Sequence, residues 1–225
     1  MNKIKTMLLT IVAIFGFTTV SNAFSLSGAY LELGTSAVGV ETSGSHNDND
    51  GDISVGSLGK TAVTTSYGLG YMTSRSNKMG LDAGYLWTPG EAKFKATSDD
   101  TATDVTFEIS DSTEYYISPM INITEDASVY LKFGWNESDI KTTGDVTKLN
   151  SMEGTTVALG TVMSWGSNLF IRTEAGMTDY DKLTVTGLGT SCNAAGNNAG
   201  CVATTTKVTA SPTVHYGKIA IGYKF

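Results

Sequence analysis

Eight segments of the chain alternate between an apolar face and a face of small, polar or charged residues, which is the pattern of β-strands. They cover residues 26–38, 61–72, 80–87, 113–123, 128–135, 155–165, 169–178 and 215–225. No Asp, Glu, Lys or Arg occurs on the apolar faces. The opposite faces carry four acidic and four basic residues, Glu32, Asp82, Glu114, Lys132, Arg172, Glu174, Lys218 and Lys224. Because a slip of one residue exchanges the two faces of a strand, this segregation fixes the side of a sheet that each residue occupies.

The links between these segments alternate in length. Residues 39–60, 88–112, 136–154 and 179–212 are long, whereas 73–79, 124–127 and 166–168 are short. This order is typical of a membrane barrel with long loops outside and tight turns in the periplasm. A soluble sandwich would also alternate, but its exposed faces would be richer in charge than in glycine and alanine. The sequence therefore predicts an all-β fold, an eight-stranded antiparallel up-and-down transmembrane β-barrel.

Two local features refine this barrel. The last strand is expected to close against the first, which removes both edges of the sheet. Pro119 lacks a backbone donor and predicts an edge or a bulge in the fourth segment.

Aromatic residues mark the ends of the apolar faces. Trp87 and Trp135 lie at predicted strand ends beside long links, and Tyr71, Trp165, Tyr223 and Phe225 lie beside short turns or the terminus. Two belts of aromatic side chains are what the two membrane–water interfaces favour. The terminal Phe225 is accordingly expected at the inner interface rather than in water.

The first 23 residues read as a secretory signal peptide. Lys3 and Lys5 precede an apolar run, and Ser21-Asn22-Ala23 supplies small residues before a cleavage site at Phe24. A membrane anchor is the alternative, but the run is short for a span of about 20 residues. Residues 24–225 would then form one barrel domain. Removal of two of the 15 basic residues leaves 13 against 22 acidic ones, a balance that excludes nucleic acid as a partner.

Cys192 and Cys201 are separated by a short polar stretch, and in an exported protein this pair predicts a disulfide loop. Two free thiols are the alternative. A metal site is disfavoured, because no histidine lies nearby and two sulfur ligands do not complete a tetrahedral shell.

The charged faces predict the content of the lumen. An eight-stranded barrel is just filled by its side chains, so we expect Arg172 to pair with Glu174, and Lys132 or Lys218 with Glu32, Asp82 or Glu114. Buried charges need such partners because an isolated one carries a desolvation cost of several kcal/mol. This ion-pair network predicts a plugged interior. The alternative is that the pairs gate a narrow passive pore for small solutes or hydrophobic compounds.

Catalysis and metal binding find little support. The two histidines, His46 and His215, have no serine and carboxylate at a diagnostic spacing. Alignment of Gly51 with the sixth position of a calcium loop places His46 at the first and Ser57 at the twelfth, where Asp and Glu are required. We therefore expect no enzyme activity, no cofactor and no metal, and a solvated acidic loop at 46–52.

The segments SGAYLELG, LFIRTEAGMTDYD and GKIAIGYKF resemble the small eight-stranded barrels of the OmpA-type transmembrane domain and opacity-protein group of surface antigens, over essentially the whole mature chain. The resemblance implies an integral protein of the Gram-negative outer membrane, without a specific activity. It also implies that Tyr223 and Phe225 form a C-terminal signal for the barrel-assembly machinery.

The same resemblance indicates the partners of the chain. Periplasmic chaperones would act during biogenesis and outer-membrane lipid would surround the mature barrel. The long links contain sixteen acidic and seven basic residues and could bind an extracellular receptor or a phage. A periplasmic domain that binds peptidoglycan is missing from the sequence, so anchoring to the cell wall is not expected.

Overall fold

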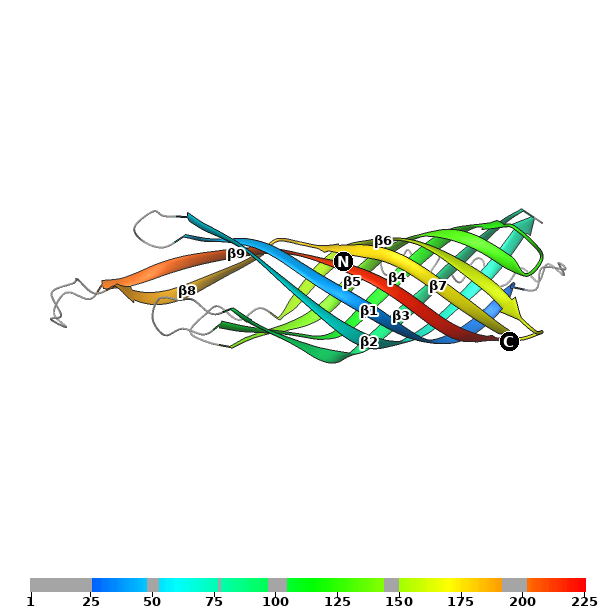
Figure 1. Ribbon diagram of the computed structural model, residues 1–225, viewed down its shortest axis with the longest axis horizontal. Helices are drawn as coiled ribbons and strands as arrows, with labels where there is room; N and C mark the ends of the chain where they lie inside the picture. Colours follow the sequence, from blue (N-terminus) through cyan, green and yellow to red (C-terminus); the bar gives the residue numbers. More distant parts are fainter. Residues whose placement is uncertain (1–25, 48–52, 77, 97–104, 144–149, 192–201) are drawn as a thin grey trace.

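The computed structural model describes residues 26–47, 53–76, 78–96, 105–143, 150–191 and 202–225. These residues form nine β-strands in one antiparallel sheet (Figure 1). The strands are β1 (Gly28–Asn47), β2 (Ile53–Ser76), β3 (Met79–Ala96), β4 (Val105–Asn122), β5 (Ala127–Thr143), β6 (Ser151–Trp165), β7 (Leu169–Tyr180), β8 (Leu183–Ser191) and β9 (Val202–Lys224). Within the described part of the chain, no helix is long and apolar enough to cross a bilayer.

The sheet closes into a barrel with eight strand positions around it, and we call each of these positions a stave. β1 pairs with both β2 and β9, and the backbone amide of Phe225 donates to the carbonyl of Ala29 at 2.9 Å. β8 follows β7 after a break at 181–182 and pairs with the outer half of β9, so β7 and β8 together form one stave. The prediction of a closed eight-stranded antiparallel barrel is therefore confirmed.

The strands extend well beyond the segments that the alternation predicted. β1 and β2 stay paired as far as Asn47 and Ile53, and β3 and β4 as far as Ala96 and Val105. Most of each predicted long link is thus paired strand, and the predicted strand ends were wrong. The reason is that apolar alternation reports contact with lipid, whereas backbone pairing continues with polar residues on both faces.

The two ends of the barrel differ. At one end, the short-turn end, two to four residues separate β2 from β3, β4 from β5, and β6 from β7. At the other end, the hairpin end, paired strands project well past the barrel body, and β8 with β9 reaches furthest in Figure 1. The sorting of connections by length that the sequence showed is therefore present, although the long connections are mainly β-hairpins.

The apolar side chains lie on the outside of the barrel. Leu31, Leu159 and Ile221 are 52–60% exposed, although they are among the most hydrophobic residues of the chain. On β6 the outward residues from Val157 to Trp165 carry no charge. At about 3.3 Å per residue and a tilt of about 40°, this run rises about 20 Å, close to the apolar band of about 25 Å expected of a membrane barrel.

Outward aromatic residues form two groups. Trp165, Tyr223 and Phe225 are exposed at the short-turn end, and the rings of Tyr223 and Phe225 lie 5.3 Å apart. Tyr71, which is half-exposed, lies further along β2, five residues before that strand ends.

Trp87 and Trp135 are exposed but do not lie at strand ends, which corrects the prediction. β3 and β5 continue to residues 96 and 143 beyond them. Trp87 stacks near Tyr67 at 5.7 Å, and Tyr85 lies near Tyr115 at 5.0 Å. We call the outward residues Tyr67, Tyr85, Trp87, Tyr115 and Trp135 the outer belt. Beyond this belt the strands continue into the hairpin end.

Pro119 lies in the body of the closed sheet, not at an edge. It pairs with Leu81 of β3, while the ladder with β5 omits Ser118 and Pro119 and resumes in the same register. The expectation of an edge or a bulge at this position was therefore wrong. The closed sheet accommodates the missing donor by leaving a short gap in one ladder.

Inside the barrel, large side chains lie over glycines of the neighbouring strand. Phe170 is paired with Gly222, and a Cβ atom at Gly222 would overlap the Phe170 ring. Tyr130 covers Gly160 in the same way. The glycines on the inward faces therefore provide the space that the buried aromatic rings occupy.

Candidate functional site

The centre of the lumen contains a compact cluster of buried charges. Arg172 of β7 is 1% exposed and its Nε lies 3.1 Å from Oε2 of Glu32 on β1. Its Nη2 lies 2.8 Å from Oδ2 of Asp82 on β3. One side chain therefore connects three staves across the interior of the barrel.

A second part of the cluster is centred on Lys132 of β5, which is also 1% exposed. Its Nζ lies 2.8 Å from Oε1 of Glu114 and 2.6 Å from Oε1 of Glu174. Lys218 of β9 joins the two parts, because its Nζ lies 3.0 Å from Oε1 of Glu32 and 4.0 Å from Oε1 of Glu174.

Tyrosine hydroxyls supply further hydrogen bonds to these carboxylates. Tyr130 and Tyr216 each donate to Glu174 at 2.7 Å, and Tyr30 donates to Asp82 at 2.8 Å. The hydroxyls of Tyr30 and Tyr116 also share a hydrogen bond. With every side chain ionised, the cluster has four carboxylates and three cations. Its net charge is therefore one negative charge.

Two details of the predicted network differ from this arrangement. Arg172 and Glu174 do not pair with each other, because Arg172 reaches toward β1 and β3 whereas Glu174 meets Lys132 from β5. Lys224 lies outside the cluster, half-buried at the end of β9 beside Gly28. The other seven charged residues that the alternation placed on inward faces are all buried and lie together.

An apolar layer lies between this cluster and the short-turn end. It consists of Leu26, Met72, Met120, Val162 and Phe170, each at most 2% exposed. The rings of Phe170 and Tyr30 meet edge to face at 5.3 Å between centroids. The lumen is therefore filled in two successive layers, one charged and one apolar.

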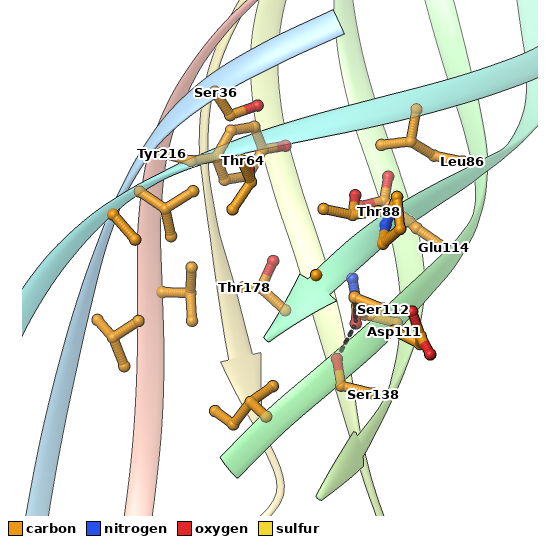
Figure 2. Close-up of a pocket in the computed structure, with 18 of the residues that line it drawn as sticks. Ser36, Thr64, Leu86, Thr88, Asp111, Ser112, Glu114, Ser138, Thr178 and Tyr216 are labelled. Atoms are coloured by element: carbon orange, nitrogen blue, oxygen red, sulfur yellow. Dashed lines mark hydrogen bonds between the residues drawn. The ribbon is translucent and has the colours of Figure 1, made fainter. Parts of the chain in front are cut away.

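On the opposite side of the cluster, toward the hairpin end, the barrel encloses a cavity of about 500 Å³. Figure 2 shows Ser36, Thr64, Leu86, Thr178 and Tyr216 around this common space. Lys132, Lys218 and Glu114 belong to its lining, so the charged cluster forms its floor. We call this space the outer cavity.

The wall of the outer cavity is interrupted between β2 and β3. Their pairing ends at Tyr67 and Trp87, although β2 continues from Ser66 to Ile53 and β3 continues to Ala96. Residues on both sides of this gap line the cavity, Val63 and Thr65 from β2 and Pro89 and Gly90 from β3. The cavity thus has a lateral opening just beyond the outer belt.

The lateral opening was not predicted from the sequence, because residues 88–112 were interpreted as one long link. The available signal was Pro89-Gly90, which follows the outer-belt residue Trp87 after one intervening residue, Thr88. Pro89 has no backbone donor for a ladder, Gly90 adopts a φ of 136°, and the β3–β4 register shifts between Thr88 and Glu91. β4 has a matching shift around Asp111, whose φ is 44°.

Other predicted sites can be placed only in part. Cys192 and Cys201, and most of the 46–52 segment, lie outside the described residues. His215 is exposed on the outer side of β9, paired with Gly39 and Met177. Within the described part of the chain, no group of three or more His, Cys, Asp and Glu residues is arranged to hold a metal ion.

A closed sheet with an apolar outside, aromatic belts and a charged interior defines an integral membrane β-barrel. Residues 8–210 match the family described as outer membrane protein beta-barrel domain. The chain therefore belongs to this family, which places it in the bacterial outer membrane.

Solved structures of outer-membrane proteins are similar to this chain. OprG from Pseudomonas aeruginosa shares the fold; it is 17% identical with a TM-score of 0.52, and the match covers 88% of this chain and 96% of OprG. The attachment invasion locus protein Ail of Yersinia pestis, in complex with the heparin analogue sucrose octasulfate, is 15% identical with a TM-score of 0.43, covering 85% and 99%. Neisserial surface protein A is 13% identical with a TM-score of 0.39, covering 88% and 98%. No curated protein sequence matches the chain.

Proposed function

We propose that the protein is a non-conducting outer-membrane barrel that holds polar β-hairpins at the cell surface. The observation that carries this proposal is the buried charged cluster. Arg172 and Lys132 are each 1% exposed and bind carboxylates from four different strands across the lumen. Ions or solutes would have to separate these pairs, and each unpaired buried charge costs several kcal/mol.

The hairpin end supports the surface role. Paired strands continue beyond the outer belt in three places, β1 with β2, β3 with β4, and β8 with β9. Backbone pairing is obligatory only within the hydrocarbon, so it is not lipid that maintains these extensions. Such projecting hairpins offer backbone and polar side chains to an extracellular receptor or a phage. The signal peptide at 1–23 and a disulfide between Cys192 and Cys201, in the sequence between β8 and β9, are part of the same proposal, as is the absence of catalysis.

Conductance of the refolded protein in planar bilayers tests the sealed lumen. We expect no current steps from the wild-type protein or from Thr173→Ala, which changes an exposed residue on the outer face of β7. Steady open events in the wild type, altered in size by Glu174→Ala but not by Thr173→Ala, would overturn the proposal. That result would instead favour a narrow passive pore controlled by the ion pairs.

A further inference from the structure

The ionisable groups at the centre of the lumen do not balance in charge. Four carboxylates share three cations, and all seven side chains are at most 6% exposed. They are Glu32, Asp82, Glu114 and Glu174 with Lys132, Arg172 and Lys218. Lys60 and Asp111 also line the outer cavity, but both are exposed and they add one charge of each sign. Because a buried charge without a partner is costly, the cluster lacks one positive charge.

Two of the four carboxylates each meet two cations. Glu32 lies 3.1 Å from Nε of Arg172 and 3.0 Å from Nζ of Lys218. Glu174 lies 2.6 Å from Nζ of Lys132 and 4.0 Å from Nζ of Lys218, and it accepts hydrogen bonds from two tyrosine hydroxyls. These two side chains are therefore compensated as anions.

The other two carboxylates, Glu114 and Asp82, each meet a single cation. Glu114 lies 2.8 Å from Lys132, and Asp82 lies 2.8 Å from Arg172; each cation is shared with one of the compensated carboxylates. Glu114 lines the outer cavity, where water can solvate it, whereas Asp82 is 0% exposed and is not part of that lining. Asp82 is thus the carboxylate whose negative charge is least compensated.

The surroundings of Asp82 suit a neutral acid. Its Oδ1 atom lies 2.8 Å from the hydroxyl of Tyr30, which shares a further hydrogen bond with the hydroxyl of Tyr116. Because a hydroxyl can accept as well as donate, Tyr30 can accept from a protonated carboxyl and donate its own hydrogen to Tyr116. Ser118 lies directly opposite Asp82 in the β3–β4 ladder, but its buried hydroxyl bonds to no group in the described part of the chain. Asp82 therefore lacks the extra donor that an ionised carboxylate would need.

We propose that the cluster binds one proton and that this proton is on Asp82 at neutral pH. The charged groups that face Asp82 are Arg172 from β7 and Glu32 from β1, and the titratable groups are Tyr30 from β1 and Tyr116 from β4. Burial and the Glu32 carboxylate both favour the protonated acid, and the charge of Arg172 is shared with Glu32. The bound proton makes the cluster neutral, so it attracts neither cations nor anions into the lumen. This site goes beyond the proposed surface role and does not depend on whether the lumen conducts.

Infrared spectra of the refolded protein in lipid vesicles at pH 7 test the assignment. Exposed carboxyls are ionised at this pH, so the carbonyl band of a protonated carboxyl reports a buried acid. We expect the band of a single acid per chain. Aspartate labelled with carbon-13 at the side-chain carboxyl should shift this band, and glutamate labelled in the same way should not. Absence of the band, or a shift with labelled glutamate, would overturn the proposal.

Matched variants locate the proton independently. Asp82→Asn should remove the band, and so should Glu114→Gln, because three carboxylates then face three cations and Asp82 ionises. Asp179→Asn and Glu153→Gln make the same chemical changes at exposed positions on β7 and β6, and they should leave the band unchanged. A band that survives in Asp82→Asn or in Glu114→Gln would contradict the site. If either cluster variant does not fold, the labelled wild-type protein still decides.

Discussion

Removal of the positive charge at Lys132 should destabilise the barrel strongly. The Nζ atom lies between Glu114 at 2.8 Å and Glu174 at 2.6 Å, and the side chain is 1% exposed. Lys132→Met keeps the length of the side chain but leaves two buried carboxylates without this partner. Breaking a buried pair by removing one member typically costs about 3–5 kcal/mol, and we expect a loss of unfolding free energy in this range.

Reversible urea unfolding in lipid vesicles measures this loss. Trp87, Trp135 and Trp165 all face outward and report the transfer from lipid to water by fluorescence. Glu114→Gln provides the matched variant, because it removes one carboxylate from a cluster that has one in excess. It should cost less than Lys132→Met, and the double variant should be more stable than the sum of the two losses predicts. A loss below about 1 kcal/mol for Lys132→Met, or strict additivity, would refute the reasoning.

The interior packing and the sidedness lead to further predictions. Gly222→Ala should lower the unfolding free energy by about 1–3 kcal/mol, because the added Cβ meets the buried Phe170 ring. Phe170→Leu in the same chain should recover part of this loss. If the double variant recovers nothing, the Phe170–Gly222 contact is not the cause. An epitope tag inserted within 193–200 should bind antibody on intact cells, whereas the same tag within the 166–168 turn should bind only after permeabilisation. Labelling of both tags on intact cells would contradict the assigned orientation.

The sidedness of the eight strand segments that the alternation identified could be predicted from the sequence because lipid tolerates few charges. A charged residue on the outer face of the barrel, at Leu159 or Ile221, would cost about 2–4 kcal/mol near mid-membrane. The same constraint is enough to place Glu32, Asp82 and Arg172 on inward faces. Closure of the last strand on the first follows because open edges are not compatible with hydrocarbon.

The strand lengths and the pairing partners could not be predicted in the same way. Beyond the outer belt, both faces of a strand can be polar, so periodicity no longer distinguishes strand from loop. Inside the lumen, long side chains from β1, β3, β4, β5, β7 and β9 converge. Arg172 can therefore reach β1 and β3 instead of Glu174 two residues away. The outer cavity depends on the local irregularity at Pro89 and Gly90, whose consequence emerges only when the neighbouring strand is placed.

The central claim is that lipid covers the outside of a barrel whose interior is closed. Nitroxide labels along β6, in a chain with Cys192→Ser and Cys201→Ser, test both parts together. Labels at Val157, Leu159 and Met163 should be accessible to oxygen dissolved in the bilayer, and labels at Ala158 and Val162 should be shielded from oxygen and from a water-soluble nickel chelate alike. Free access of the nickel chelate to Ala158 and Val162, or absence of the alternation, would contradict the account.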